Sequence, residues 1–491
     1  MCAFPESLET EHFLLLYTTD SSSVGHADPA YVQEAAGYLE QVWNIYEHDP
    51  RFEMPPAVGS GPTGASGNRL VKVYVEALSG AYGYATWVDP IPGRCPNAAT
   101  GELELDSALS DFALRRTCAH ELFHVFCYGI DAAWVNWIRE STATWAEWTV
   151  WPDFRDVIPV LRLFYTSQLT LWEDQDFDWQ RMYGAALFWQ FLEDRLGEPV
   201  APIVWKALCD APWRSTTREV LQQRYGRDLD GLVVEFWRWN VRAGYADDGA
   251  HYRSGAGLPH LPAQAVQRTF GPEPQSLPDS LVAQPAGTNL IVLHGPSRRE
   301  NLHVTFDGAP ELAGRRAVTL LATTWPNTFP YEVTLTPDAS GDCIFDVPHW
   351  ELYDEVALLV TNYESAADYP SSLGYRWSAE EAGPPVFDVA WGLSARALEA
   401  SRLVAAPNPF AAATQIRYRA DAAATTSLDV YDVAGRHVRA LVRPLVRPVA
   451  GDYLADWDGT DDAGAPLPAG VYFLRLGTAK FAETRRIGIV R

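Results

Sequence analysis

A pair of histidines four residues apart is the feature of this sequence with the clearest chemistry. Within the segment 114–128, LRRTCAHELFHVFCY, His120, Glu121 and His124 fit the pattern H-E-x-x-H. Residues i and i+4 of an α-helix lie about 40° apart around its axis, so both imidazoles can bind one Zn²⁺ ion while Glu121 faces a water molecule on that metal. Apolar residues recur at every third or fourth position of the segment, which predicts a helix. The alternative is a helix that carries two solvated histidines.

A catalytic zinc ion needs a third protein ligand and one open position. The metzincin pattern would require glycine at position 127 and histidine at position 130, but Cys127 and Ile130 stand there and exclude it. Glu140 lies near the start of the next predicted helix, 137–148, and would complete a set of two histidines and one glutamate. Glu147 lies two turns further on, about 10 Å at 1.5 Å per residue, so only one carboxylate can reach the metal, and we expect Glu140. The alternative is that both acids lie on an ordinary exposed face of the helix and bind no metal.

The elements that position these residues form an α+β unit. Asp28 and Pro29 begin an amphipathic helix, and residues 70–76 (LVKVYVE) alternate apolar and polar side chains as a half-buried strand does. The stretch 120–243 is mainly helical by its pattern. Three further helices are expected there, at 183–196, 216–225 and 228–239.

Beyond residue 270 the hydrophobic period changes to two. A linker-like stretch, 244–262, is small, polar and contains proline. After it, short strand-like runs are separated by turn clusters, which indicates all-β sandwiches. These runs are 289–293, 302–306, 318–323, 331–336, 343–347, 355–361, 428–432, 437–441 and 471–476. We therefore expect a multidomain protein: an α+β domain at 1–270 with a mostly helical second half, then all-β sandwich domains at 271–395 and 396–491.

Charge and hydropathy exclude two classes of partner. The 491 residues contain 38 Lys and Arg against 63 Asp and Glu, a formal net charge of −25. Such an excess repels phosphate backbones, so we expect no nucleic acid partner. No stretch approaches the roughly 18 uncharged apolar residues that cross a bilayer, so we expect no transmembrane segment. The early apolar run 13–17 is too short for the core of an export signal, and the given chain carries no recognisable one.

The six cysteines lack the paired spacing of a thiolate metal site or a redox motif. Cys118 and Cys127 share one predicted helix and lie about 13 Å apart along it, so they cannot pair with each other. Buried free thiols are the favoured interpretation. One pairing through Cys95 stays open.

Three runs of the sequence carry a resemblance to a known family: AHELFHVF, WIRESTATWAEW and YGAALFWQFLEDRLG (183–197). They resemble the gluzincin type of zinc metallopeptidase, specifically the secreted bacterial peptidase-MA-like proteases. The family pattern is H-E-x-x-H followed by W-x-x-E-G-x-A-x-W. The resemblance covers about the first 245 residues and implies a zincin-like fold for the N-terminal domain. Ser141 stands in place of the usual glycine, and Thr144 stands where thermolysin-like enzymes have an acidic residue that orients a zinc-bound histidine. The partner of that imidazole is therefore unidentified.

The resemblance implies a role for each residue of the site. His120, His124 and Glu140 would hold one catalytic Zn²⁺ ion, and Glu121 would act as general base on water. Tyr183 is the candidate donor to the developing oxyanion; the alternative is that it packs at the start of its helix. The implied protein is a zinc-dependent endopeptidase that hydrolyses protein or peptide substrates. The rival is a catalytically silent surface-binding or adhesion protein on the same scaffold.

Two aromatic residues near the predicted site have two interpretations. Tyr82 and Tyr84 flank Gly83 in a strand-like segment, YGYATW, that the resemblance also covers. They either line the substrate cleft or pack in the interior. Because aromatic residues are common in this chain, packing is favoured.

The C-terminal stretch carries a second resemblance. It consists of residues 408–410 (NPF), followed by LDVYDVAGRHVRALV and WDGTDDAGAPLPAGVYFLRL. These runs are similar to the immunoglobulin-like domain of hook-capping proteins and to the sorting domains that follow many secreted bacterial enzymes. This implies a secreted or cell-surface protein whose last domain contacts the cell surface or the secretion machinery. Four aspartates in the last run indicate either a calcium site or a tight turn, and the turn is favoured. They are Asp456, Asp458, Asp461 and Asp462.

Overall fold

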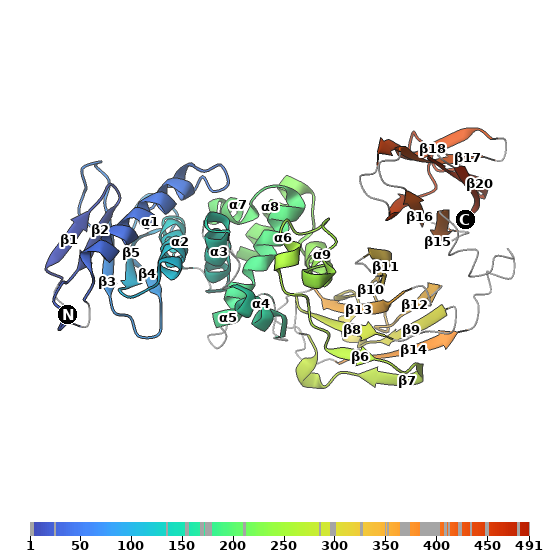
Figure 1. Ribbon diagram of the computed structural model, residues 1–491, viewed down its shortest axis with the longest axis horizontal. Helices are drawn as coiled ribbons and strands as arrows, with labels where there is room; N and C mark the ends of the chain where they lie inside the picture. Colours follow the sequence, from blue (N-terminus) through green and yellow to red (C-terminus); the bar gives the residue numbers. More distant parts are fainter. Residues whose placement is uncertain are drawn as a thin grey trace.

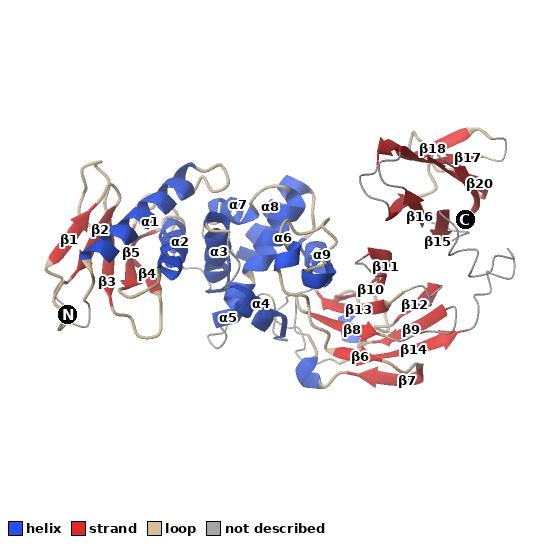
Figure 2. Cartoon of the chain, viewed as in Figure 1, coloured by secondary structure: helices blue, strands red, loops and turns tan. Residues whose placement is uncertain are grey.

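The computed structural model describes most of the chain and shows several separate β-sheets with helices between the first two (Figures 1 and 2). The described residues are 4–23, 26–133, 136–152, 157–166, 171, 179–209, 213–283, 286–294, 301–324, 328–348, 350, 353–363, 374–382, 403–406, 410, 413–420, 425–432, 435–446, 451–478 and 482–490. The predicted domain boundary between 395 and 396 and the residues 408 and 409 lie outside these ranges, so the predicted domain limits stay a prediction.

A five-stranded sheet opens the chain. Its strands are β1 (Glu6–Glu9), β2 (Phe13–Tyr17), β3 (Val71–Glu76), β4 (Gly83–Pro90) and β5 (Ala99–Asp106). They lie in the order β1-β2-β3-β5-β4, with β2, β3 and β5 parallel to one another and β4 antiparallel to β5 at the edge. Along β3 every second side chain is buried, as its alternating sequence predicts. Helix α1 (Pro29–His48) packs on the buried face, and Asp28 caps its N-terminus by accepting from the Ala30 amide.

A block of helices follows the sheet (Figure 2). The helices are α2 (Asp111–Tyr128), α3 (Asn136–Val150), α4 (Val157–Thr166), α5 (Trp179–Gly184), α6 (Ala186–Leu196), α7 (Val200–Ala207), α8 (Trp213–Tyr225) and α9 (Leu229–Val241). They share one hydrophobic core with α1 and the sheet, and four fully buried tryptophans lie within it: Trp137, Trp145, Trp189 and Trp205. No helix in the described ranges is long and apolar enough to cross a membrane.

The helix boundaries differ from the sequence predictions at two places. The predicted helix 183–196 is two elements, because α5 ends at Gly184 and α6 begins at Ala186. The predicted start at Thr216 is wrong, since α8 begins at Trp213 and Thr216 is buried within it. The predicted end at Gly197, which is left-handed with φ 83°, and the predicted start at Asp228, which caps the N-terminus of α9, are confirmed.

Glycines in two neighbouring strands let α2 lie close to the sheet. A Cβ atom on Gly83 of β4 would come within 2.7 Å of a methyl carbon of Thr117, and one on Gly101 of β5 within 2.8 Å of a methyl carbon of Val125. Approaches that short do not occur between real side chains, so any larger residue would push the helix away. These glycines therefore set the position of α2 beside the edge strand β4.

A β-sandwich follows the helices. Its strands are β6 (Ala265–Gln267), β7 (Gly271–Ser276), β8 (Thr288–Leu293), β9 (Asn301–Asp307), β10 (Arg316–Thr324), β11 (Thr328–Leu335), β12 (Cys343–Pro348), β13 (Glu355–Asn362) and β14 (Arg376–Ala382). They form two sheets, ordered β11-β10-β13-β8-β6 and β12-β9-β14-β7, around a shared apolar core. The alternating runs predicted as strands correspond to β8 to β13.

The stretch 244–262, predicted as a linker, packs onto the helical block. Tyr252, Leu258 and Leu261 of this stretch are buried in the same core as the helices. The prediction was wrong because composition alone cannot distinguish an exposed spacer from a segment that a few apolar side chains hold down. Helix α9 also contacts the sandwich, where Trp237 Nε1 donates to the Ala286 carbonyl at 2.9 Å.

The last described residues form a second β-sandwich with its own core. Its strands are β15 (Leu403–Ala406), β16 (Thr414–Ala420), β17 (Thr425–Tyr431), β18 (His437–Val446), β19 (Gly451–Trp457), β20 (Gly470–Thr478) and β21 (Ala482–Ile489). The sheets are ordered β15-β16-β19 and β18-β17-β20-β21. Two of the four aspartates that raised the alternative of a calcium site serve turns. Asp458 accepts from the Thr460 amide and hydroxyl, and Asp461 accepts from the amides of Ala463 and Ala465.

Candidate metal centre

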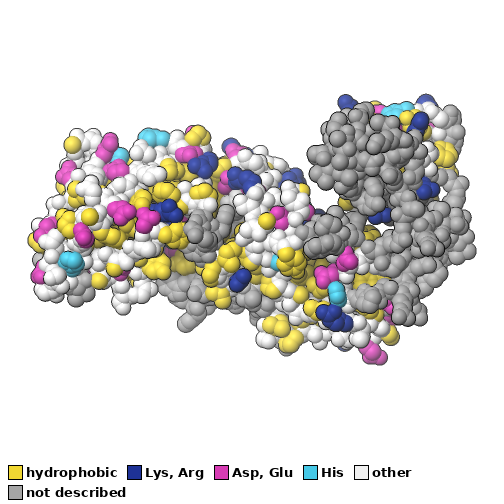
Figure 3. Space-filling model, in the orientation of Figure 1, with side chains coloured by type: hydrophobic (Ala, Val, Ile, Leu, Met, Phe, Trp, Pro, Cys, Tyr) yellow, Lys and Arg dark blue, Asp and Glu magenta, His cyan; other side chains and the backbone are white. Residues whose placement is uncertain are grey.

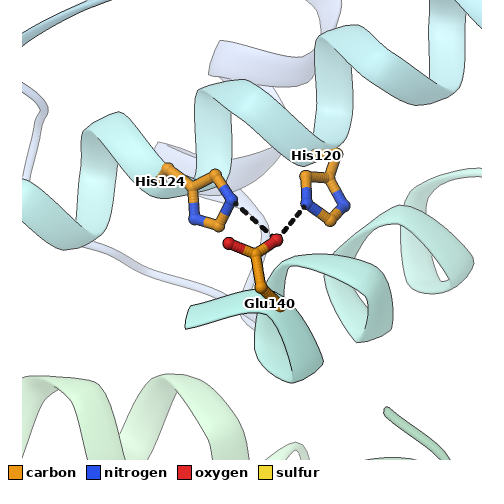
Figure 4. A group of neighbouring side chains, drawn as sticks. All are labelled: His120, His124 and Glu140. Carbon is orange, nitrogen blue, oxygen red and sulfur yellow. Dashed lines mark hydrogen bonds and ion pairs between the residues drawn. The ribbon is translucent and has the colours of Figure 1, made fainter. Parts of the chain in front are cut away.

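Two helices bring three possible ligands together. His120 and His124 lie one turn apart on α2, and Glu140 faces them from the first turns of α3 (Figure 4). One carboxylate oxygen of Glu140 lies 3.1 Å from His120 Nε2 and 3.5 Å from His124 Nε2. All three residues are buried, and one ligand atom from each lies within 4.8 Å of the others. The residues that the spacing selected as ligands are therefore neighbours in space.

The distances from Glu140 to the two histidines suit ligands of a tetrahedral ion. Ligand atoms at about 2.0 to 2.1 Å from a tetrahedral zinc ion are about 3.3 to 3.4 Å apart. The two nitrogen–oxygen distances, 3.1 and 3.5 Å, lie on either side of that value. Imidazole nitrogen and carboxylate oxygen are both zinc ligands, and three protein ligands leave one position open. The residues present therefore fit a catalytic type of metal site.

A carboxylate that the sequence did not assign holds the first histidine. Glu147 lies two turns after Glu140 on α3, and its Oε2 is 3.3 Å from His120 Nδ1. Its other oxygen accepts from Arg116 Nε at 2.6 Å, and Arg116 is almost fully buried one turn before His120. A ring nitrogen held in this way fixes the orientation of the imidazole, so that Nε2 faces Glu140. Thr144, at the position where the orienting acid was sought, makes no hydrogen bond to either histidine.

The local charges favour ionised carboxylates around the histidines. Burial alone would lower the pKa of His120, but its hydrogen bonds to Glu140 and Glu147 raise the pKa well above the usual value. Burial alone would raise the pKa of Glu140, but the two imidazoles hold it below the usual range. Burial lowers the pKa of His124. Without a metal, His120 is therefore protonated, with the Nε2 proton directed to Glu140 and the Nδ1 proton to Glu147, and a metal ion at Nε2 has to displace the Nε2 proton.

Glu121 lies beside this group on the side of the edge strand. The space above Gly83 of β4 is filled by Thr117 and Glu121, because a Cβ atom at Gly83 would come 3.0 Å from Glu121 Cγ. Burial raises the pKa of Glu121 to about 7, and the negative charges of Glu140 and Glu147 add to the shift. A carboxyl group with such a pKa can both accept and release a proton near neutral pH.

Tyr183 lies next to the histidines, but not where the sequence placed it. It belongs to the last turn of α5 rather than to the start of the following helix. Its ring lies edge-on to His120, with centroids 5.6 Å apart, and burial raises the pKa of its hydroxyl. A Cβ atom on Gly184 would come 2.4 Å from Phe164 Cβ, so α5 packs closely on α4 at that point. The structure thus brings Tyr183 to the site, and both proposed roles stay open.

Tryptophans hold α3 in place and account for Ser141. The indole nitrogen of Trp189 donates to Ser141 Oγ at 2.9 Å, and that of Trp205 donates to Thr142 Oγ1 at 3.0 Å. Both acceptors directly follow Glu140 in the chain. A glycine at position 141 would leave the buried Trp189 nitrogen without this acceptor, which costs free energy.

One pair of cysteines contradicts the favoured interpretation of free thiols. Cys95, in the connection after β4, forms a disulfide with Cys209, which follows α7. The bond joins residues 114 positions apart, so no local spacing could reveal it. Cys118 and Cys127 are free and buried, as expected.

The interior packing favoured for two tyrosines is also wrong. The exposed fraction of Tyr82 is 66% and that of Tyr84 is 48%, and Trp87 in the same strand is 52% exposed. The edge strand β4 therefore presents Tyr84 and Trp87 to solvent, and Tyr82 is exposed directly before the strand begins.

Comparisons with known proteins identify the last part of the chain. Residues 410–480 match the family model of the FlgD Ig-like domain, which confirms the expectation of an Ig-like domain of that type there. No curated protein matches the chain.

Solved structures resemble parts of the chain distantly. PorZ, a bacterial surface component of the type-IX secretion system of Porphyromonas gingivalis, is 17% identical over 25% of this chain and 14% of its own, with a TM-score of 0.14. Dimeric latent PorU from the same organism is 13% identical over 35% of this chain and 16% of its own, with a TM-score of 0.16. A putative β-galactosidase from Bacteroides fragilis is 13% identical over 41% of this chain and 32% of its own, with a TM-score of 0.14. The chain thus matches less than a third of the length of each.

Proposed function

We propose that this chain is a zinc-dependent endopeptidase of the gluzincin type, with a zincin-like domain over residues 1–270. The observation that carries the proposal is the convergence of His120, His124 and Glu140, with Glu121 next to them on the same helix. This donor set, with an adjacent buried carboxylate, is what metal-assisted hydrolysis requires.

Each residue of the group has a distinct task in this proposal. His120 and His124 would hold the ion through Nε2, and Glu140 through one carboxylate oxygen. When bound, zinc supplies a Lewis acid that lowers the pKa of water from about 15.7 to about 7. Glu121 takes a proton from the attacking water and passes it to the leaving amine, a role that its burial next to the ligands suits. Tyr183 is the candidate donor to the carbonyl oxygen on which negative charge develops.

The edge strand favours a peptide as substrate. The Asp106 amide donates to the Tyr82 carbonyl, so by the alternation of an antiparallel pair the backbone groups of Gly83 and Ala85 point away from β5. Among the described residues no strand pairs with that side of β4, although Tyr128 donates its hydroxyl to the Ala85 carbonyl at 3.0 Å. An extended peptide can therefore add to this edge by main-chain hydrogen bonds, which would bring a scissile bond next to Glu121.

We also propose that the protein works outside the cytoplasm. The disulfide between Cys95 and Cys209 is of the kind that persists in oxidising compartments. The FlgD Ig-like match at 410–480 supports the proposal that the last domain contacts the cell surface or the secretion machinery.

Replacing Glu121 tests the function most simply. In zinc-loaded full-length protein, Glu121→Gln should keep the metal and lower peptide hydrolysis by about 10² to 10⁴, since only the general base is lost. Glu219→Gln, on the exposed side of α8, is the matched control and should change neither property. Loss of zinc from Glu121→Gln would contradict the assigned role. A zinc-loaded wild type that cleaves no member of a broad peptide pool would support the rival, a silent surface-binding scaffold.

A further inference from the structure

The edge strand β4 has side chains on both of its faces beside the candidate site. Gly83 and Ala85 face α2, and Trp87 follows them on that side, opposite Gly101 of β5. Tyr84 lies on the other face, opposite Glu104. The two aromatic side chains are about half exposed. An extended chain added to this edge would therefore have an aromatic neighbour on each of its faces.

Cross-strand neighbours determine which side chains such an edge prefers. Directly opposite residues on one face of an antiparallel pair have Cβ atoms about 4.5 to 5.5 Å apart, and aromatic rings pair favourably with aromatic or β-branched partners. An exposed ring next to Tyr84 or Trp87 would be partly removed from water. A serine or glycine at the same positions would gain little.

Charge on the same surface weakly disfavours another class of side chain. Glu102 and Glu104 of β5 lie on the face of Tyr84, opposite Thr86 and Tyr84 respectively. Glu76 is close enough to Glu104 for the two carboxylates to repel each other. Figure 3 shows the same mixture over the N-terminal unit, where apolar side chains are interspersed with acidic ones. The carboxylates of β5 lie one strand beyond β4, about 10 Å from a strand added at its free edge, so acidic residues of a bound peptide on this face would meet a weak, salt-dependent repulsion.

We propose that Tyr84 and Trp87 select extended polypeptide segments with aromatic or β-branched residues, and with few acidic ones, next to the scissile bond. This inference rests on the proposed peptidase function and names its substrate class. The surface is continuous with the candidate site, because a Cβ atom on Gly83, next to Tyr84 in the strand, would come 3.0 Å from Glu121 Cγ. The inference concerns side-chain preference, whereas main-chain pairing along β4 alone would accept any sequence.

Cleavage of a peptide pool tests the preference. A tryptic digest of unrelated proteins is incubated with zinc-loaded full-length protein, and the new termini are identified by mass spectrometry. We expect aromatic and β-branched residues to be enriched, and acidic residues weakly depleted, within about three positions of the cut. For a peptide with phenylalanine on the face of Tyr84, Tyr84→Ala should lower kcat/KM by about three- to tenfold and Trp87→Ala should not. For a peptide with phenylalanine on the face of Trp87, the effects of the two variants should be reversed. The serine analogue of each peptide should be cleaved equally by wild type and variants.

A matched control and a binding measurement separate this inference from the proposed function. Tyr245→Ala removes a tyrosine that is 72% exposed outside β4 and should leave the preference unchanged. In the Glu121→Gln background, fluorescence anisotropy should show tighter binding of the peptide with phenylalanine on the face of Tyr84 than of its serine analogue, and Tyr84→Ala should abolish the difference. If the wild type hydrolyses nothing but this difference is found, the peptidase function fails and the binding preference stands. Equal binding of both peptides, or an unchanged cleavage profile in both alanine variants, overturns the inference.

Discussion

Glu147→Gln is the substitution that best separates a ligand from a residue that orients one. In the structure Glu147 touches His120 Nδ1 at 3.3 Å and Arg116 Nε at 2.6 Å, while Glu140 occupies the side of Nε2. The glutamine keeps the length of the side chain but loses its charge. Its amide group must also point hydrogen-bond donors at either Arg116 or His120, both of which are donors themselves.

The size of the effect follows from these contacts. A hydrogen bond from an imidazole to an ionised carboxylate contributes about 1.5 to 3 kcal/mol, and loss of such an outer partner usually weakens metal binding by about 10- to 100-fold. A factor of 10 to 100 corresponds to about 1.4 to 2.8 kcal/mol, so the two ranges agree. We therefore expect zinc affinity to fall by about 10- to 100-fold in Glu147→Gln, with the stoichiometry of one zinc per chain retained at saturation.

Competition with a chromophoric chelator measures this affinity in full-length protein. Glu219→Gln serves as the control, because that carboxylate is exposed on α8. A double-mutant cycle with Arg116→Lys would show whether the two partners act as one unit. An affinity equal to that of the wild type would refute the orienting role. Complete loss of zinc from a folded protein would instead make Glu147 a ligand and contradict the assignment of Glu140.

Further variants and conditions test the neighbouring parts of the site. His124→Ala should remove zinc binding altogether, measured by metal analysis, while circular dichroism shows the fold retained. Tyr183→Phe should lower kcat by about ten- to a thousandfold with KM and zinc content nearly unchanged if the hydroxyl binds the oxyanion; an unchanged rate assigns the residue to packing. Zinc affinity should fall about tenfold per pH unit on acidification below the raised pKa of His120, because the metal must displace one proton; a flat pH profile of the dissociation constant would be inconsistent with that pKa. Replacing Cys95 and Cys209 by serine should lower the free energy of unfolding by about 2 to 4 kcal/mol, seen as a lower denaturant midpoint, and an unchanged midpoint would mean that the bond does not stabilise the fold.

The ligands could be predicted from the sequence because their geometry is local. Four residues separate His120 from His124, and the helical period alone puts both imidazoles on one side of α2. Glu140 could be predicted as a ligand for a similar reason, since it lies in the first turns of the next helix. The strands of the sandwiches were predictable because one buried face imposes alternation.

The orienting pair was not predictable, because it depends on how two helices cross. Glu147 lies seven residues after Glu140 and thus on the same face of α3, and Arg116 lies four residues before His120 on α2. Those spacings were the available signal. They indicate contact only once the antiparallel crossing of α2 and α3 is known, so the partner of His120 appeared only in the structure.

Long-range contacts and exposure were also beyond sequence reasoning. The disulfide of Cys95 and Cys209 depends on α7 returning to the loop after β4. The exposure of Tyr82 and Tyr84 depends on β4 being the edge of its sheet, which an alternating pattern does not reveal. Composition favoured packing for these residues, and the position of the strand decided otherwise.

Metal analysis of the purified full-length chain is the most direct test of the central claim. Protein prepared without chelators, measured by inductively coupled plasma mass spectrometry beside His124→Ala prepared in the same way, should contain one zinc ion per wild-type chain and none in the variant. A wild-type chain that contains no stoichiometric zinc, and takes up none when it is supplied, would contradict both the metal centre and the hydrolytic function built on it.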